Sequence, residues 1–233
     1  MPSMMTYPTT ITLIGATGLV GGELLSILSQ IAEVKNIKAV TRRPLGKIPA
    51  RTENIVMNLD QMEGQVDALK AEVFVCCLGT TIKTAGSQEA FRKVDYEYVM
   101  SFARVAEKVG AKKFLVVSAM GADANSSIFY NRTKGEMERD LKALNIPQIE
   151  IFQPSLILGD RKEHRSGEAF AQKLSPLLNP LLVGPLKKYR AIEATTIAKA
   201  MTIAILDFHP GRHTYRSDKI QNIVDETAKL RPK

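Results

Sequence analysis

The chain has 233 residues, of which 45% are hydrophobic and 24% are charged, a composition typical of a folded globular protein. Its length suits one α/β domain and is short for two, so we expect a single domain over residues 1–233. No stretch is long and apolar enough to cross a bilayer, and we expect no membrane partner. Residues 1–10 lack the basic start and apolar core of a secretory signal, so we expect a short disordered tail and a cytoplasmic protein.

Basic residues outnumber acidic ones by 32 to 24, which leaves a formal charge of +8. A nucleic-acid surface is one candidate explanation. However, the basic residues lie in small groups, such as Arg42-Arg43 and Lys187-Lys188, without the aromatic residues of a single-strand platform or a helix-turn-helix pattern. An anionic cofactor or substrate explains the charge more simply, and we do not expect a nucleic-acid partner.

The first predicted strand, at 10–14, runs into a glycine-rich turn and then into a predicted helix at 22–29. The spacing of Gly15, Gly18 and Gly21 is typical of a turn that holds a phosphate. The first glycine allows a tight reversal, the second lets a pyrophosphate approach the backbone, and the third lets the helix pack closely on the sheet. The helix N-terminus adds unpaired N–H groups. The expected phosphate contacts are Gly15, Thr17, Gly18, Leu19 and Val20. A plain strand-to-helix turn is the alternative.

The second predicted strand, at 37–41, ends at Arg42 and Arg43, where a site that grips a ribose 2′-hydroxyl would have an acidic residue. Because arginine forks pair well with a 2′-phosphate, these residues predict NADP(H) rather than NAD, with ordinary loop charges as the alternative. The third predicted strand, at 54–58, precedes Asp60. This carboxylate either accepts a hydrogen bond from the adenine amino group or caps the following helix.

The fourth predicted strand, at 73–77, ends in Cys76 and Cys77. Adjacent cysteines on a buried strand suit neither a disulfide framework nor metal-ligand spacing, so we interpret them as small core residues. His164, His209 and His213 also lack metal-ligand spacing, and no metal is expected.

A long predicted helix at 88–109 leads to a fifth strand at 113–118 and a second long helix at 127–144. A sixth strand at 148–152 is followed by loops rich in proline and basic residues at 153–190. We interpret these loops as a substrate lid, with a structural cover of the sheet as the alternative. A packed helix at 194–206 and a late strand at 213–216 close the chain.

The alternation of strands and helices predicts an α/β fold, a single-domain Rossmann-like doubly wound parallel sheet with helices on both faces and a small C-terminal lid region. Residues 5–152 are expected to form the cofactor-binding core. Residues 153–233 are expected to form the lid, the late helix and the late strand.

Three residues in this fold could carry chemistry. Tyr130 and Lys134 lie four positions apart in the helix at 127–144, so both project from one face. An ammonium beside a phenol favours the phenolate and suits Tyr130 to proton transfer. Ser118, at the end of the preceding strand, is positioned to hydrogen-bond a substrate carbonyl. The alternative is a core-edge tyrosine with a solvated lysine. The neighbouring acidic residues are interpreted as a solvated helix face; they are Glu136, Glu138 and Asp140.

The glycine turn, Ser118 and the Tyr130-x-x-x-Lys134 pair together resemble the short-chain dehydrogenase/reductase superfamily over nearly the whole chain. More narrowly, four segments are similar to the atypical branch that contains the Tat-interactive-protein oxidoreductases. They are 76–81, Val94-Asp95, 130–136 and 160–165.

The resemblance implies a Rossmann-type domain that binds NADP(H), with Tyr130 as proton donor, Lys134 on the nicotinamide ribose and Ser118 orienting the carbonyl. It also implies cofactor contacts from the loops after two other strands. These residues are Leu78, Gly79 and Thr80, then Pro154, Ser155 and Ile157, and finally Arg165, which reaches the cofactor or the substrate. The chain departs from the family pattern at Gln153-Pro154-Ser155, where relatives often have Arg-Pro-Gly.

These observations predict an NADP(H)-dependent oxidoreductase that passes a hydride between nicotinamide and a small carbonyl or alcohol substrate. The alternative is an NADP(H)-binding sensor with little catalytic activity. We expect substrate specificity to lie in the lid at 159–190, and the protein to be a monomer or a homodimer.

Overall fold

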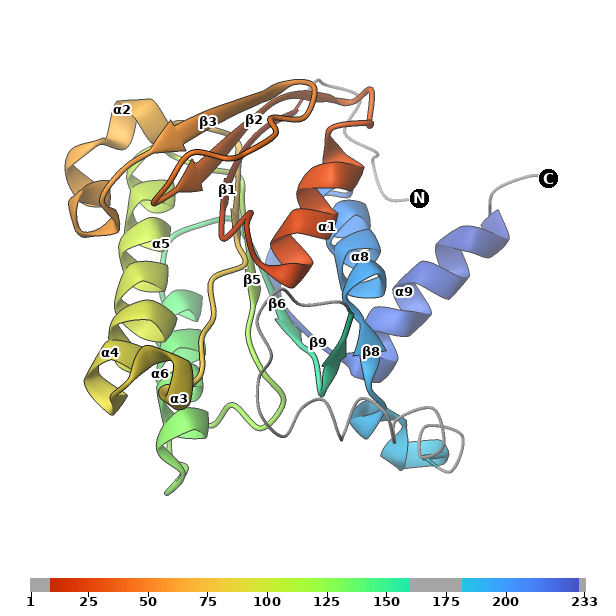
Figure 1. Cartoon of the computed structure of the whole chain (residues 1–233). Coiled ribbons are helices and arrows are strands. Elements are labelled where there is room, and N and C mark those ends of the chain that lie inside the picture. Colours follow the sequence, from red (N-terminus) through yellow and green to blue (C-terminus); the bar gives the residue numbers. More distant parts are fainter. Residues whose placement is uncertain (1–8, 160–181, 231–233) are drawn as a thin grey trace.

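The computed structural model describes residues 9–159 and 182–230 of the chain. Its main feature is a sheet of seven parallel strands in the order β3-β2-β1-β4-β5-β6-β9 (Figure 1). The strands are β1 (Thr9–Ile14), β2 (Val34–Thr41), β3 (Thr52–Val56), β4 (Val73–Cys76), β5 (Lys113–Val117), β6 (Gln148–Gln153) and β9 (Gly211–Arg216). The predicted doubly wound α/β fold is confirmed.

Burial on both faces explains why these sequences form central strands. All residues of β4, β5 and β6 are buried, and β4 and β5 are made almost wholly of valine, phenylalanine and leucine. The strand order reverses between β1 and β4, because β1 pairs with β2 on one side and with β4 on the other. Ligands of open α/β sheets bind at such a reversal, outside the carboxyl ends of the strands.

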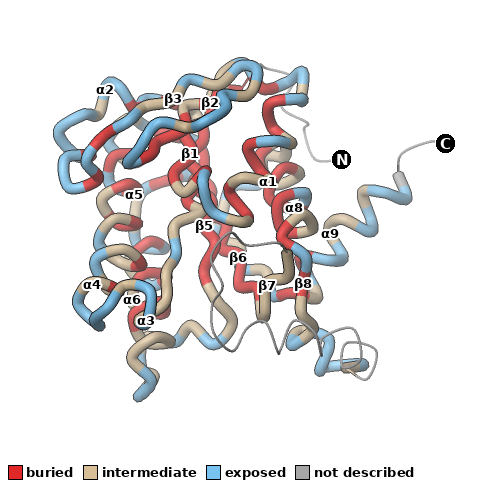
Figure 2. Tube along the Cα trace, in the orientation of Figure 1, coloured by how far each residue is buried: buried red, intermediate tan, exposed pale blue. Residues whose placement is uncertain are grey.

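Helices cover both faces of the sheet, each over its own set of buried side chains (Figures 1 and 2). On one face lie α1 (Leu19–Leu28), α8 (Ala194–Leu206) and α9 (Ser217–Leu230). On the other lie α4 (Gln88–Arg92), α5 (Tyr98–Lys108) and α6 (Phe129–Lys142). Shorter elements connect them: η1 (Leu59–Gly64), α2 (Val66–Leu69), α3 (Ile82–Ala85), η4 (Gly184–Tyr189), and the paired short strands β7 (Ile157–Leu158) and β8 (Ile192–Glu193).

The long helix predicted at 88–109 is interrupted. A π-helical turn, η2 (Lys93–Glu97), separates α4 from α5. A π turn inserts an extra residue into the helical repeat and occurs frequently at functional sites. In this chain the turn carries Asp95, which is fully buried.

Several element boundaries differ from the prediction. Helix α1 begins at Leu19 rather than at residue 22, so the phosphate-binding turn runs directly into its first turn. Helix α8 spans the predicted residues 194–206. Helix α9 was not predicted, and β9 begins at Gly211 rather than at residue 213. The expected disordered tail lies mostly outside the described residues. No helix within 9–159 and 182–230 has the length and apolar character required to span a membrane.

Candidate functional site

The turn after β1 combines two glycines that the protein itself requires with one that it does not. A Cβ on Gly15, whose φ is +86°, would lie 2.5 Å from the carbonyl carbon of Cys77. A Cβ on Gly21 would lie 2.2 Å from the oxygen of Gly15. At Gly18 the nearest neighbour of a Cβ would be the Gly15 oxygen, at 3.3 Å, and the backbone conformation there is one that any residue adopts. Close packing therefore explains Gly15 and Gly21, whereas a Cβ on Gly18 would make one tight contact with a backbone oxygen.

This turn has the features of an anion site. Gly18 is the N-cap of α1, a helix of ten residues, and within the described chain no side chain caps it. The first N–H groups of α1, at Leu19 and Val20, lack partners inside the helix because no turn precedes them. Thr17 precedes the N-cap. Together these groups form the expected cradle for a pyrophosphate.

The loop after β4 lies against the glycine turn, as the close approach of Gly15 to Cys77 and Leu78 requires. Leu78 packs partly buried against the core. The backbone N–H of Thr80 donates a hydrogen bond of 2.9 Å to Asp95 Oδ2, which fixes the loop to the π turn. Gly79 lies over the same carboxylate, since a Cβ there would be 3.7 Å from Asp95 Oδ1.

Asp95 also holds the predicted catalytic lysine. Lys134 Nζ lies 2.7 Å from Asp95 Oδ1, and the two side chains are 3% and 0% exposed. Apart from Lys134, Asp95 Oδ1 has no hydrogen-bond donor among the described residues. Burial acts to lower the pKa of Lys134, but the Asp95 carboxylate and Tyr130 outweigh it and raise this pKa above its usual value. Lys134 is therefore an ammonium held in the protein interior.

Tyr130 lies one helical turn before Lys134 on α6 and is only partly buried. Its ring packs against Phe91 of α4, with ring centroids 5.2 Å apart. Phe91 also contacts Phe129 edge-on, at 6.0 Å. The ring of Tyr130 is therefore supported by α4, and Tyr130 is close enough to Lys134 to help raise the pKa of that lysine.

The third predicted catalytic residue, Ser118, belongs to a different polar cluster. Ser118 Oγ donates a hydrogen bond of 2.5 Å to Glu138 Oε1. Gln153 Nε2 donates to both oxygens of the same carboxylate, at 2.9 Å each. All three side chains are buried. Glu138 follows Lys134 by four residues, so Tyr130, Lys134 and Glu138 share one face of α6.

Glu138 and Asp95 lie in surroundings that the sequence did not predict. Glu138 was expected on a solvated helix face, but it is buried, because its position repeats the helical spacing of Tyr130 and Lys134. The four-residue spacing from Lys134 could have indicated the burial of Glu138 from the sequence. In the sequence, Asp95 contributed only to the family resemblance. Its burial could not be predicted, because a π turn does not change the periodicity of apolar residues in a recognisable way.

The predicted NADP(H) contacts on the second and third strands are exposed. Arg42 and Arg43 follow β2, and neither guanidinium has a hydrogen bond or an ion pair with any described residue. Asp60 pairs with Lys93 Nζ at 2.9 Å. Of the two alternatives for Asp60, the helix cap is wrong, because Asn58 is the N-cap of η1 and its side chain accepts from Asp60 N. The Asn58 side chain reaches the N–H two residues ahead, a geometry typical of a cap.

The segment after β6 is bonded to residues from other parts of the chain. The oxygen of Pro154 accepts a hydrogen bond of 2.9 Å from Met120 N in the loop after β5. Ser155 N donates to Ser217 Oγ at 2.9 Å, and Ser155 Oγ donates to the carbonyl oxygen of Arg190. Ile157 belongs to β7, which pairs with β8. Arg165 and most of the predicted lid lie outside the described residues.

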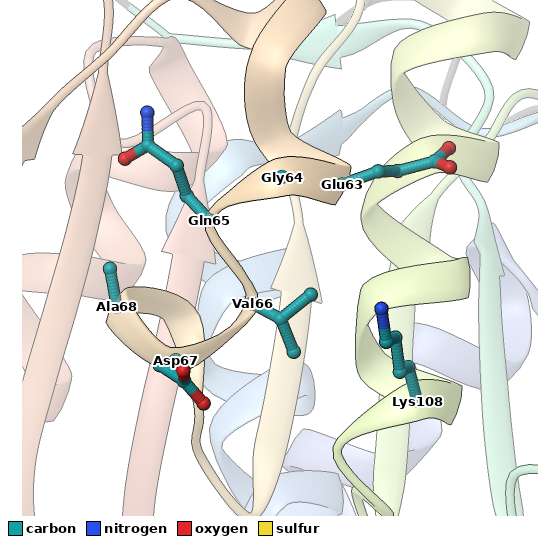
Figure 3. Close-up of a pocket in the computed structure, with 7 residues that line it drawn as sticks. All are labelled: Glu63, Gly64, Gln65, Val66, Asp67, Ala68 and Lys108. Atoms are coloured by element: carbon teal, nitrogen blue, oxygen red, sulfur yellow. The ribbon is translucent and has the colours of Figure 1, made fainter.

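A surface depression of about 510 Å³ lies away from this constellation (Figure 3). It is lined by Glu63, Gly64, Gln65, Val66, Asp67, Ala68 and Lys108. Lys108 ends α5, whereas Asp95 precedes the start of that helix, so about 16 Å of helix separates the two. Nothing that lines the depression belongs to the predicted site. Across the described residues, no three His, Cys, Asp or Glu side chains are grouped as metal ligands.

Comparison with known proteins identifies the family. Residues 47–184 match the HIM1 family model. "Protein FMP52, mitochondrial" of Meyerozyma guilliermondii is 33% identical over 199 residues, covering 84% of each chain. The Aspergillus niger protein of the same name is 32% identical over 217 residues, covering 90% of this chain and 92% of its own.

Solved structures share the fold at low sequence identity. MoeE5, solved with UDP-glucose and NAD, has a TM-score of 0.67 at 15% identity, over 95% of this chain and 81% of its own. Bordetella bronchiseptica WbmH, solved with NAD+, has a TM-score of 0.69 at 12% identity, over 97% of this chain and 84% of its own. Both comparisons support the Rossmann-type fold.

The expectation of a cytoplasmic protein is wrong, because the curated relatives are named as mitochondrial proteins. It depended on the lack of a secretory signal, and such a signal governs export rather than import into mitochondria. The predicted family, in contrast, is confirmed. The HIM1 model matches more than half of the chain and the fungal relatives align over most of it, so the chain belongs to the HIM1 family.

Proposed function

We propose that the protein is an oxidoreductase that uses NADP(H) to pass a hydride between nicotinamide and a small carbonyl or alcohol substrate. One observation carries this proposal: the buried ion pair of Lys134 and Asp95, at 2.7 Å. It holds a fixed ammonium beside Tyr130 and connects that ammonium, through Thr80 N, to the loop that borders the glycine turn. A merely solvated lysine would have none of these contacts.

The glycine turn supports a dinucleotide cofactor. Among the described residues, a Cβ on Gly18 would meet two backbone oxygens within 4 Å, those of Gly15 and Cys77. A pyrophosphate there would meet the N–H groups at the start of α1. Lys134 has three N–H hydrogens and a single close anionic partner, so hydrogens remain for the hydroxyls of a nicotinamide ribose.

The side chains of α6 suit the proton-transfer part of the reaction. A bound nicotinamide cofactor would supply or accept the hydride at the substrate carbon. During reduction, Tyr130 gives its hydroxyl proton to the carbonyl oxygen, and the ammonium of Lys134 stabilises the phenolate that remains. During oxidation, the phenolate takes the proton back from the alcohol. Because Lys134 is buried, its charge is weakly screened by solvent.

Arg42 and Arg43 support NADP(H) over NAD(H). Both lie at the carboxyl end of β2, next to the strand that carries the glycine turn, and both are exposed without partners among the described residues. A guanidinium fork pairs with a phosphate through two hydrogen bonds. We expect Arg42→Ala with Arg43→Ala to weaken NADPH binding by about tenfold or more and to leave NADH binding almost unchanged. Titrations followed by nicotinamide fluorescence measure both affinities.

The purified protein tests the proposal directly. NADPH binding is measured by fluorescence, and turnover of aldehydes and ketones is followed by the absorbance of NADPH. Tight binding with turnover of at least one carbonyl supports the oxidoreductase. Tight binding without turnover of any carbonyl would instead favour an NADP(H) sensor, and absence of nicotinamide binding would contradict both functions.

The names of the fungal relatives support a mitochondrial location for this protein. Fractionation of cells that express the full chain, with protease protection of intact mitochondria, tests this location. Recovery in the cytosolic fraction alone would contradict it.

A further inference from the structure

The ion pair of Lys134 and Asp95 brings two opposite charges into the protein interior without leaving a net charge there. The two side chains are 3% and 0% exposed, and Lys134 Nζ lies 2.7 Å from Asp95 Oδ1. Burial raises the pKa of the neighbouring Cys76 thiol to about 12, so this thiol adds no charge at neutral pH. Lys134 and Asp95 therefore form a neutral pair in surroundings that screen charge weakly.

Asp95 is held from two sides. Thr80 N, in the loop after β4, donates a hydrogen bond of 2.9 Å to Asp95 Oδ2, while α6 brings Lys134 to the other carboxylate oxygen. The loop after β4 also approaches Gly15, and Lys134 interacts with Tyr130. The pair therefore links the glycine turn to the predicted proton donor.

The oxidised and reduced forms of a nicotinamide cofactor differ in the charge of the ring. The oxidised ring carries a positive charge, the reduced ring is neutral, and the phosphates of the two forms are the same. In the proposed function, Lys134 meets the ribose that bears this ring. A buried ammonium without a counter-charge would repel the oxidised ring and leave the reduced ring almost unaffected. The carboxylate of Asp95 opposes that repulsion.

We propose that Asp95 is a specificity-determining residue for the oxidation state of the cofactor, because its carboxylate cancels the charge of Lys134 and lets the site bind NADP+ as well as NADPH. This inference rests on the proposed oxidoreductase function, which places Lys134 on the nicotinamide ribose. It adds a consequence for the direction of the reaction. A site that accepts both forms serves carbonyl reduction and alcohol oxidation alike, and the relative concentrations of the two forms decide which occurs.

The affinities for the two cofactor forms test the inference without turnover. Isothermal titration calorimetry of the full chain with NADP+ and with NADPH gives two dissociation constants, and their ratio isolates the effect of the ring charge. We expect the two constants of the wild type to agree within about threefold, because the pair contributes no net charge. A preference of the wild type for NADPH by about thirtyfold or more would overturn the inference.

Asp95→Asn removes the charge of the carboxylate and preserves the size of the side chain. The titrations are run at about pH 6.5, which favours the protonated form of Lys134. Relative to NADPH, we expect this variant to bind NADP+ about tenfold more weakly than the wild type does. A cofactor site that is merely loosened loses affinity for both forms together, so an unchanged ratio would overturn the inference. Glu97→Gln is the matched control and should keep the wild-type ratio, since Glu97 belongs to the same π turn but is exposed.

Lys134→Met tests the same charge balance with the opposite sign, and it serves if Asp95→Asn does not fold. This variant leaves the carboxylate without its ammonium, so we expect the ratio to shift by about tenfold towards NADP+. Adding Asp95→Asn makes the pair neutral again and should return the ratio to within about threefold of the wild type. A shift towards NADPH in Lys134→Met, or a ratio that the double variant does not restore, would contradict the role of Asp95.

The outcomes separate this inference from the proposed function. Binding of neither cofactor form by the wild type would overturn both. Binding of both forms, with one ratio shared by the wild type and all variants, would overturn the role of Asp95 alone and leave the oxidoreductase in place. If the ratios shift as expected and no carbonyl is reduced, the proposed oxidoreductase fails and the role of Asp95 in cofactor binding stands.

Discussion

At the scale of single residues, the three glycines of the turn predict which substitutions disturb the fold and which mainly weaken cofactor binding. Gly15 and Gly21 are held by backbone contacts that a Cβ would violate, whereas a Cβ on Gly18 would meet its nearest atom at 3.3 Å. Because 3.3 Å is a tight contact with a backbone oxygen, we expect Gly18→Ala to lower the melting temperature slightly and to weaken NADPH binding by about tenfold or more, since the methyl group blocks the pyrophosphate. Gly22→Ala is the control, since a Cβ there lies 3.5 Å from the Ala16 oxygen. Equal NADPH affinities in the two variants would contradict a ligand at Gly18.

The buried pair of Lys134 and Asp95 predicts a coupled effect on stability. Lys134→Met leaves the fully buried Asp95 without its counter-charge, and we expect it to lower the free energy of unfolding by about 3–5 kcal/mol. Adding Asp95→Asn removes the stranded charge and should restore about half of that loss. Urea denaturation of the two single variants and the double variant measures the coupling. Losses that simply add would show that the pair does not act as a unit.

At the scale of elements, two helices end on basic side chains contributed by distant strands. Lys113, the first residue of β5, donates through Nζ to the carbonyl oxygens of Ala204, Ile205 and Asp207 at the end of α8. Arg212 of β9 donates to the carbonyl oxygens of Lys142, Leu144 and Ile146 after α6. Cations at these positions satisfy the free carbonyls and complement the helix dipole. Part of the net positive charge of the chain therefore stabilises helix ends in the folded protein.

The cap on α8 predicts a pH dependence. Burial lowers the pKa of Lys113 from 10.5 to about 8, against the attraction of Asp207 and Glu150. Between pH 8 and 10.5 the unfolded chain binds more protons at this residue than the folded protein does, so stability rises with pH across this window. We expect the free energy of unfolding of the wild type, relative to Lys113→Met, to increase by up to about 3 kcal/mol from pH 7 to pH 10.5. Denaturation across this range measures the difference, and a flat difference would contradict the lowered pKa.

The elements also show where sequence periodicity suffices and where it does not. Helix α8 and the central strands were predicted because continuous apolar runs and helical spacing reflect burial directly. The π turn at Lys93–Glu97 was not, since one extra residue leaves a helical pattern almost unchanged. A cap at Asp60 was one of two alternatives for that residue, and Asn58 takes the cap instead; both are good capping residues, and only the backbone conformation decides between them.

At the scale of the whole molecule, the parallel sheet explains how the predicted site residues meet. The glycine turn, Thr80, Ser118 and Pro154 follow β1, β4, β5 and β6, which are neighbours in one parallel sheet, so all four lie at the same edge. The sequence indicated the participants, since strand ends and motifs are local. It could not indicate that Ser118 binds Glu138 while Lys134 binds Asp95, because partner choice depends on packing between segments far apart in the chain.

The most direct test of the central claim is the turnover of Tyr130→Phe. Phenylalanine preserves the ring that packs 5.2 Å from Phe91 and removes only the hydroxyl group. If Tyr130 transfers the proton, kcat for carbonyl reduction by NADPH falls by about 10²–10⁴-fold. The dissociation constant for NADPH should stay within about threefold of the wild type, because the remaining cofactor contacts are intact. Turnover equal to that of the wild type would contradict the assignment of Tyr130 as the proton donor.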